Sequence, residues 1–263
     1  MTQNRSLSSA AIASSLSGLG IEPGDLVYLQ LDDCSNAQLQ SLFGSSRCER
    51  LIDAICDLLG EEGTLVMPTF TYSFSRGEIF DLQCSASAMG PASEAFRCRP
   101  EVRRSANPMF SVAARGRHAA AFAEADADDC FGVDTAFGVL HALNGTILNL
   151  GANFSRLAFI HYVEQTAEVD YRVFRQFSGI VEEADGTQWP AEVRSFVRHP
   201  RRPDGFNYPR LRGWLSEKAM LATAKMGQME LLAIKAHDLF TGGDGTVAPA
   251  SSRATPTPSP GKR

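Results

Sequence analysis

The sequence predicts an α/β fold with a central mixed sheet flanked by helices and a smaller C-terminal antiparallel β portion. Three short apolar runs, at residues 25–31, 63–68 and 146–150, are typical of buried strands. Segments with apolar residues at helical spacing lie between them, and strands that alternate with helices form βαβ units. Short alternating runs at residues 177–181 and 192–197, around Trp189, indicate the smaller antiparallel part.

The first half of the chain contains one complete βαβ unit after an N-terminal helix. In order, the predicted elements are a helix over residues 7–19, a strand over 25–31, a helix over 50–59 and a strand over 63–68. Gly20 and Pro23 end the first helix, whereas Pro68 ends the second strand because proline lacks an N–H group. The carboxyl ends of both strands face one rim, where we expect residues 30–32 and 69–72 to meet.

The second half of the chain adds further helices and strands. The predicted elements are a short helix over residues 92–98, strands over 110–114 and 146–150, helices over 157–168 and 211–226, a strand over 229–234 and a helical turn over 236–240. His161 and Glu164 are three residues apart, so their side chains are neighbours on one helix surface. Residues 247–263, rich in Pro, Ser and Thr, predict a disordered tail and leave residues 1–246 as a single domain.

Composition and charge exclude several classes of protein. Of 263 residues, 25 are Lys or Arg and 30 are Asp or Glu, and a net charge of −5 argues against a dedicated nucleic-acid-binding protein. The chain has neither an uninterrupted apolar run of about 18 residues nor the apolar core of a secretory signal, so we expect no membrane role and a cytoplasmic location. The six cysteines form no CxxC pair, which predicts neither a zinc site nor a disulfide scaffold.

Four segments carry the functional information. The general motifs GxxxxGK[ST], HExxH and GxSxG are absent, which removes support for phosphate-loop, zinc-protease and serine-hydrolase chemistry. The segments are residues 63–71 (GTLVMPTFT), 93–97 (SEAFR), 104–116 (RSANPMFSVAARG) and 160–164 (IHYVE). In this order, across about residues 7–240, the chain resembles the aminoglycoside 3-N-acetyltransferase family.

The resemblance implies an activity and a set of site residues. It implies the antibiotic N-acetyltransferase fold, distinct from the GNAT fold, and transfer of an acetyl group from acetyl-coenzyme A to a primary amine, in a ternary complex without a covalent acyl-enzyme. The resemblance implies that Thr69, Thr71, Arg104, Ser105, Ser111 and Gly138 contact coenzyme A. Of these, Gly138 matches a glycine-bearing loop of the family. On the substrate side we expect Asp32, Tyr72 and Glu94, although Glu94 has the alternative of pairing with Arg97.

The expected chemistry gives a role to His161. An amine attacks a thioester only when it is unprotonated, and a positioned base can hold or remove its proton. The imidazole of His161 suits this task, and Glu164 can orient the ring and stabilise its charged form. Residue type and spacing alone favour a structural hydrogen-bonded pair, whereas the resemblance favours catalysis for His161. For Glu164, a catalytic partner and a structural support both stay open.

The chain departs from the family pattern near the expected site. Members that acetylate drugs commonly carry a His-Ser-Ser segment at the end of the first strand, where this chain has Gln30, Leu31 and Asp32. They also commonly carry two histidines at the positions of Asn107 and Phe110. Ala158 replaces a threonine that is often found three residues before the catalytic histidine. These replacements favour an amino sugar or a small natural product as the acceptor.

Three alternatives stay open from the sequence. An aminoglycoside-resistance enzyme would use acidic residues such as Asp32 and Glu94 to attract a polycation. A donor on an acyl carrier protein would use an arginine cluster formed by Arg194, Arg198, Arg201, Arg202, Arg210 and Arg212. The same cluster has two other interpretations, a contact to the coenzyme A nucleotide and a solvated run of charges. A non-catalytic ligand-binding homologue would explain Gln30, Asn107 and Ala158. The sequence indicates no oligomeric state.

Overall fold

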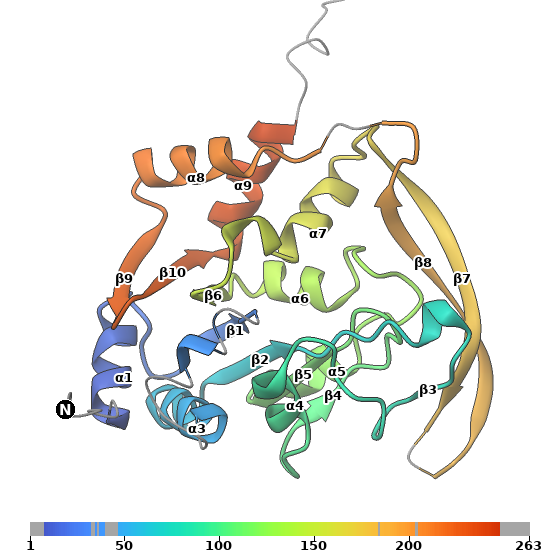
Figure 1. Ribbon diagram of the computed structural model, residues 1–263, viewed down its shortest axis with the longest axis horizontal. Helices are drawn as coiled ribbons and strands as arrows, with labels where there is room; N and C mark the ends of the chain where they lie inside the picture. The colour runs from blue at the N-terminus through green and yellow to red at the C-terminus, as the bar shows by residue number, and fades with distance from the viewer. Residues whose placement is uncertain are drawn as a thin grey trace, which may run out of the picture.

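Two sheets and the helices around them make up the described part of the chain (Figure 1). The structure is a computed structural model that describes residues 8–247, apart from 33–34, 36, 40–46, 184 and 203–204. Among these residues, seven strands form the central sheet in the order β4-β5-β2-β1-β6-β10-β9. Their bounds are β1 Leu26–Gln30, β2 Thr64–Pro68, β4 Arg103–Arg104, β5 Val112–Gly116, β6 Thr146–Leu150, β9 Ala222–Met226 and β10 Met229–Lys235.

The central sheet is mixed, as the sequence predicts. Strand β1 pairs in parallel with β2 and β6, with Tyr28 opposite Val66 and Ile147, and the remaining pairs are antiparallel. All five residues of each of β1, β2 and β6 are buried, because helices cover both faces of this part of the sheet. The continuous apolar runs that predicted these strands follow from that double burial.

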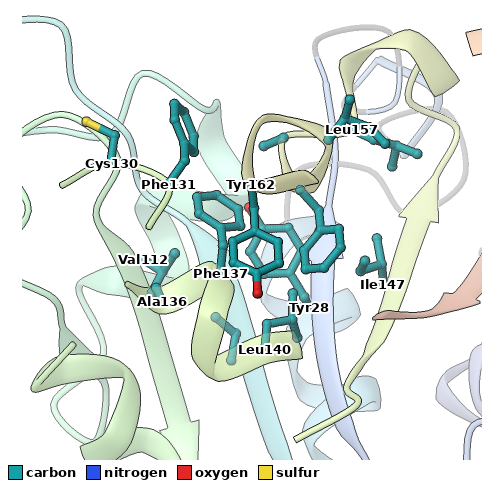
Figure 2. Packing of buried hydrophobic residues seen from close by; sticks show 14 of the residues in the cluster. Tyr28, Val112, Cys130, Phe131, Ala136, Phe137, Leu140, Ile147, Leu157 and Tyr162 are labelled. Atoms are coloured by element: carbon teal, nitrogen blue, oxygen red, sulfur yellow. The ribbon is translucent and has the colours of Figure 1, made fainter. Parts of the chain in front are cut away.

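Alternate residues of the central strands belong to two separate cores. Tyr28 and Ile147 pack on one face, whereas Val27 and Leu148 pack on the other. The helices on the second face are α1 (Ser9–Ser17), α3 (Arg47–Leu59) and α4 (Pro91–Arg97). The helices on the first face are α5 (Ala119–Ala123), α6 (Ala136–Ala142), α7 (Phe159–Thr166), α8 (Tyr208–Glu217) and α9 (Ala236–Val247). Figure 2 shows Tyr28, Phe137 and Leu140 packed together in this first core.

The smaller sheet consists of a long antiparallel hairpin and one short strand. Strand β7 (Arg172–Glu182) pairs with β8 (Gln188–Arg198), and β3 (Phe80–Asp81) pairs in parallel with the end of β7. The hairpin runs along the right side of the molecule in Figure 1. It confirms the predicted antiparallel part and includes Trp189. After the hairpin the chain returns to the central sheet through α8, β9 and β10.

The predicted helix over residues 211–226 is wrong in its second half. Helix α8 ends at Glu217, and Ala219 has a φ of 56°, a left-handed conformation that reverses the chain. The residues after it form β9, which pairs with β10 across a turn at Gly227. Apolar residues at helical spacing continue through this break, so periodicity alone does not locate it.

The predicted glycine-bearing loop around Gly138 is also wrong, because these residues form helix α6. A Cβ atom at Gly138 would lie 1.8 Å from the Val133 carbonyl oxygen, so the helix start packs against the preceding loop only with glycine there. The short helices α5 and α6 and the two-residue strands β3 and β4 were not predicted, since such short elements carry little periodic signal.

Other predictions concern the ends of the chain and membranes. The predicted disordered tail covers residues 247–263, of which Val247 ends helix α9 and the rest lie outside the described residues. A single domain over residues 1–246 stays a prediction. None of the helices that the structure describes is both long and apolar enough to cross a bilayer.

Candidate active site

A histidine and a glutamate on helix α7 form the centre of the site. The Nδ1 atom of His161 lies 2.7 Å from Oε2 of Glu164, as expected for residues three apart on a helix. The Glu164 side chain is only 1% exposed, and Nε of Arg172, at the start of β7, lies 2.7 Å from the same oxygen. The glutamate therefore lies between the histidine and an arginine from the hairpin.

The surroundings of Glu164 fix its charge and the tautomer of the neutral His161 ring. Burial alone would raise the pKa of Glu164, but the hydrogen bond from His161 and the positive charges of His161 and Arg172 hold this pKa below its usual range. An ionised carboxylate can only accept hydrogen bonds, so the Nδ1 atom of His161 must donate. In the neutral ring the lone pair is then on Nε2, the atom that can take up a proton.

Two cavities meet at His161. The first, which we call the rim cavity, has a volume of about 220 Å³ and lies at the carboxyl ends of β1 and β2. Its wall is formed by Gln30, Leu31, Asp32, Pro68, Phe70, Tyr72, Ala88, Met89, Phe110, Arg156, Ala158 and His161. The sequence prediction that residues 30–32 and 69–72 meet at one rim is confirmed for Gln30, Asp32, Phe70 and Tyr72.

The second cavity, which we call the hairpin cavity, has a volume of about 510 Å³ and lies between α7 and the hairpin. It is lined by Ser155, Arg156, Leu157, His161, Glu164, Arg172, Arg198, Gly205, Phe206 and Tyr208. The two cavities share Arg156 and His161. The His161 side chain is 28% exposed, and its ring stands edge-on to Phe131 at a centroid distance of 5.1 Å.

Gln30 anchors the segment that leads into α7. Its Oε1 atom accepts a hydrogen bond from the Ala158 backbone N–H at 3.3 Å, and its Nε2 atom donates to the Arg156 carbonyl oxygen. The amide thereby binds the two residues of this segment that reach the rim cavity. The departure from the family pattern at Gln30 thus has a structural role.

Asp32 stabilises the neighbouring loop. Its carboxylate accepts hydrogen bonds from the backbone N–H groups of Ser35, at 2.9 Å, and Asn153, at 3.1 Å. Burial would raise the pKa of Asp32, but these bonds and the charge of Arg156 lower it. Asp32 is therefore ionised in the wall of the rim cavity, and half-exposed Tyr72 lies in the same wall.

The residues expected to contact coenzyme A form a buried network behind the rim cavity. Thr69 Oγ1 lies 3.1 Å from Ser111 Oγ, and Ser111 Oγ donates to the Thr69 carbonyl oxygen at 2.9 Å. The Arg104 guanidinium donates to the same Thr69 oxygen at 2.9 Å and to the Ser85 carbonyl at 2.6 Å. Its burial lowers the Arg104 pKa to about 10. These contacts hold together the loops that line the rim cavity.

The other predicted contact residues also have protein partners. Thr71 Oγ1 donates to the Pro108 carbonyl at 2.6 Å, and Ser105 Oγ accepts from the Val112 N–H at 2.9 Å. Glu94 pairs with Arg97 at 2.6 Å, which is the alternative that the sequence offered, and lies outside the described lining of both cavities. Gly138 is buried in α6. Direct ligand contacts by these residues stay a prediction.

The two residues that stand in place of the family's histidines, Asn107 and Phe110, are hydrogen-bonded to each other next to the rim cavity. Asn107 donates to the carbonyl oxygens of Ala127, at 3.0 Å, and Asp129, at 2.9 Å. Its Oδ1 accepts from the N–H of Phe110 at 2.7 Å, so the side chain joins two loops. The Phe110 ring lies in the cavity wall and contacts the ring of Phe131 at a centroid distance of 4.5 Å.

Sequence reasoning missed the arginines around the hairpin cavity. Arg156 and Arg172 belong to no motif, and Arg198 stood only as one member of a charge cluster. Three members of that cluster are ion-paired: Arg194 with Asp129, Arg202 with Asp170 and Arg212 with Glu230. The register of the hairpin places Arg172 opposite Arg198. A correct prediction of this register would have shown that these two arginines are neighbours.

Comparison with known proteins assigns the chain to a family. Residues 34–245 match the sequence model of the aminoglycoside 3-N-acetyltransferases. The chain belongs to this family. It is similar to aminoglycoside N(3)-acetyltransferase VII of Streptomyces paromomycinus, at 28% identity over 221 residues, covering 69% of this chain and 74% of the relative. It is also similar to aminoglycoside N(3)-acetyltransferase III of Pseudomonas aeruginosa, at 28% identity, covering 62% of this chain and 65% of the relative.

Solved structures share the fold. The enzyme AAC-IIIb in complex with CoASH superposes with a TM-score of 0.80 at 19% identity, covering 97% of this chain and 99% of that chain. AAC-VIa bound to sisomicin superposes with a TM-score of 0.77 at 21% identity, covering 91% and 96%. The predicted antibiotic N-acetyltransferase fold is therefore confirmed. The match to the family model, over residues 34–245, makes the chain an acyltransferase. In the part of the chain that the structure describes, no three His, Cys, Asp or Glu side chains form a group that could hold a metal ion.

Proposed function

We propose that this chain moves an acetyl group from acetyl-coenzyme A to the primary amine of an amino sugar or small natural product. The position of His161 carries this proposal. Glu164 holds the Nδ1 atom, and the ring lies where the rim cavity meets the hairpin cavity. Direct transfer requires donor and acceptor to be bound together, with a base at the reacting atoms.

The proposed reaction uses His161 first as a base and then as an acid. The acceptor nitrogen attacks the thioester carbonyl carbon while Nε2 of His161 takes one proton from that nitrogen. The new C–N bond forms, the C–S bond breaks, and the proton passes from Nε2 to the departing thiolate of coenzyme A. The Glu164 carboxylate stabilises the imidazolium between these steps, and Arg172 keeps the carboxylate ionised.

We place the donor in the rim cavity. Leu31, Phe70, Met89 and Phe110 give its wall an apolar part, and the cavity lies at the carboxyl ends of parallel strands. Such a wall suits the acetyl thioester and the pantetheine arm, and crevices at this end of a sheet are common ligand sites. This placement puts Asp32 and Tyr72 near the donor, where the sequence had placed them with the acceptor.

The acceptor then enters the hairpin cavity. This cavity is larger and more polar, and Glu164 and His161 lie in its wall. An amine bound there would meet the thioester at His161, which both cavities share, and direct attack needs the two reactants in contact beside the base.

An aminoglycoside is the second candidate acceptor, and family membership is the observation that favours it. Aminoglycosides are polycations, and Arg156 and Arg198 in the hairpin cavity would repel them. Glu94, which was expected to supply acidic charge, is bound to Arg97 instead. These contacts favour the biosynthetic acceptor over the drug.

A carrier-protein donor and a non-catalytic homologue are the remaining alternatives. The ion pairs of Arg194, Arg202 and Arg212 weaken the first, because paired arginines are less available to an acidic partner. The intact pair of His161 and Glu164 argues against the second.

Calorimetric titration of acetyl-coenzyme A, followed by measurement of thiol release with a panel of amines, tests the proposal. We expect micromolar binding, about 8 kcal/mol, and release that depends on an added amine. Absence of binding would support a carrier-protein donor or a non-catalytic role. Binding without release for any amine would contradict N-acyl transfer.

A further inference from the structure

The hairpin cavity carries an excess of positive charge. The ionisable side chains in its wall, besides His161 and Tyr208, are Arg156, Arg172, Arg198 and Glu164. Arg172 lies 2.7 Å from Glu164, so these two charges offset each other. Neither Arg156 nor Arg198 lies within 4.0 Å of a carboxylate of the described residues.

Arg156 and Arg198 both lie in the wall of the hairpin cavity, and Arg156 also lines the rim cavity, where its charge acts on Asp32. The Arg156 carbonyl accepts a hydrogen bond from Gln30, and the Arg156 N–H donates to the Asn153 carbonyl at 2.8 Å. Arg198 is paired with Arg172 in the register at the open end of the hairpin. A Cβ atom at Gly205 would lie 3.7 Å from the Arg198 guanidinium, so this group lies beside Gly205, another residue of the cavity wall.

From these contacts we infer that the acceptor is an anionic amine, one that carries a phosphate or a carboxylate group besides its amino group. This inference rests on the proposed function and specifies its acceptor class. Guanidinium groups bind phosphate and carboxylate through paired hydrogen bonds. Arg156 and Arg198 have no carboxylate from the described part of the chain in direct contact that would occupy their donors. The anionic group would bind Arg156 and Arg198, and the amine would then reach His161 in the same cavity.

The same charge does not fit the phosphates of the donor. In acetyl-coenzyme A the thioester is separated from the pyrophosphate by the whole pantetheine arm. Arg156 and Arg198 line the same 510 Å³ cavity as His161, so an anion that they bind lies close to the reacting atoms. A compact amine such as an amino-sugar phosphate meets this condition, whereas coenzyme A does not.

The test compares matched acceptors. Coenzyme A thiol release is measured with glucosamine, glucosamine 6-phosphate and glucosaminic acid, which share a backbone and differ in charge, and with the polycation sisomicin. We expect kcat/KM for one or both anionic amines to exceed that for glucosamine about 10-fold or more. Comparison of glucosamine 6-phosphate with glucosaminic acid shows whether the site prefers a phosphate or a carboxylate group on the acceptor. Preference for glucosamine or sisomicin overturns the inference while leaving acetyl transfer intact.

Two arginine variants locate the effect. Arg198→Ala removes a cavity residue, and Arg175→Ala removes an exposed arginine of β7 that lies outside the described lining. We expect Arg198→Ala to raise the KM of the anionic acceptor about 10-fold, with little change in the KM of acetyl-coenzyme A, and Arg175→Ala to change neither. An increase confined to the KM of acetyl-coenzyme A would assign the arginines to the donor and overturn the inference.

A binding measurement separates this inference from the proposed function. Each amine is titrated calorimetrically into the protein saturated with coenzyme A, so that no turnover is needed. Binding of an anionic amine that weakens in Arg198→Ala supports the inference even if turnover is not seen. If coenzyme A binds but every anionic amine binds more weakly than about 1 mM, the inference fails alone. If coenzyme A does not bind, the amines are titrated into the protein without it. Absence of binding by the anionic amines then overturns both the proposed acetyl transfer and the inference of an anionic acceptor.

Discussion

The Nδ1 atom of His161 lies 2.7 Å from Oε2 of Glu164, and this contact sets the chemistry of the site. The carboxylate is buried and ionised, so it orients the ring and leaves Nε2 as the basic atom. Arg172 approaches the same oxygen from the hairpin and links the site to the smaller sheet.

The charge of Glu164 makes a pH-dependent contribution to stability. Its pKa is lowered in the folded protein, so the contribution is present above the usual carboxyl pKa of about 4.3 and is lost as pH falls through the lower, folded-state pKa. We expect Glu164→Gln to lower the free energy of unfolding by roughly 3 kcal/mol at pH 7, because it leaves the Arg172 side chain, which is 13% exposed, without its carboxylate.

Urea unfolding of wild type and Glu164→Gln at a series of pH values checks this expectation. The difference should shrink as the pH falls below the usual carboxyl range. Glu217→Gln, an exposed change at the end of α8, should match wild type throughout. A constant difference between Glu164→Gln and wild type down to the lowest pH would disprove an ionised Glu164.

Gln30 should act as a positioning residue for α7. Gln30→Ala removes both hydrogen bonds to the segment that precedes the helix, which we expect to cost about 2 kcal/mol of stability. Since this segment places His161, kcat should fall more than the KM of the acceptor rises. Steady-state kinetics measure the changes in kcat and in acceptor KM separately. Gln188→Ala, at an exposed position of the hairpin, is the control. An unchanged kcat in a destabilised Gln30→Ala protein would assign Gln30 to folding alone.

Gly138 is predicted to serve packing. In Gly138→Ala the new Cβ would clash with the Val133 carbonyl, so we expect a loss of about 1–3 kcal/mol, with an unchanged KM for acetyl-coenzyme A. Gly213→Ala is the matched control, because it lies in α8 with nothing within 4 Å of its Cβ position. That control should gain up to about 1 kcal/mol. Thermal unfolding measures the stability change, and steady-state kinetics measure the KM of acetyl-coenzyme A. A large rise in this KM for Gly138→Ala would indicate that Gly138 contacts coenzyme A directly.

Tyr72 tests the placement of the donor. Its half-exposed ring lies in the wall of the rim cavity, so Tyr72→Ala should raise the KM of acetyl-coenzyme A about fivefold or more and spare that of the acceptor. Phe174→Ala removes a comparably exposed ring on the hairpin and serves as the control. The opposite pattern for Tyr72→Ala, with only the acceptor KM raised, would place the acceptor in the rim cavity.

Parts of the fold that depend on local pattern could be predicted from the sequence. Strands β1, β2 and β6 are buried on both faces, and their continuous apolar runs signal this directly. The pairing of His161 with Glu164 follows from helical spacing. The break between α8 and β9 could not be predicted, because the left-handed turn at Ala219 interrupts an apolar pattern that continues past it.

Parts of the site that depend on tertiary contacts could not be predicted. Arg172 reaches Glu164 only because the hairpin folds back beside α7. Thr69 and Ser111 match family positions, yet a matching hydroxyl does not reveal whether it contacts a ligand or joins two loops, as these two do. The excess charge of the hairpin cavity likewise arises from Arg156 and Arg198, which are distant in sequence.

The most direct test of the account is the rate of acetyl transfer by His161→Ala under saturating acetyl-coenzyme A. General base catalysis typically contributes about 10²-fold or more, so we expect at least this loss in kcat, in a protein that stays folded and keeps its calorimetric affinity for coenzyme A. His118→Ala, before α5, is the control histidine and should keep full activity. Near-normal turnover in His161→Ala would contradict the account, because no proton would then need to pass through this ring.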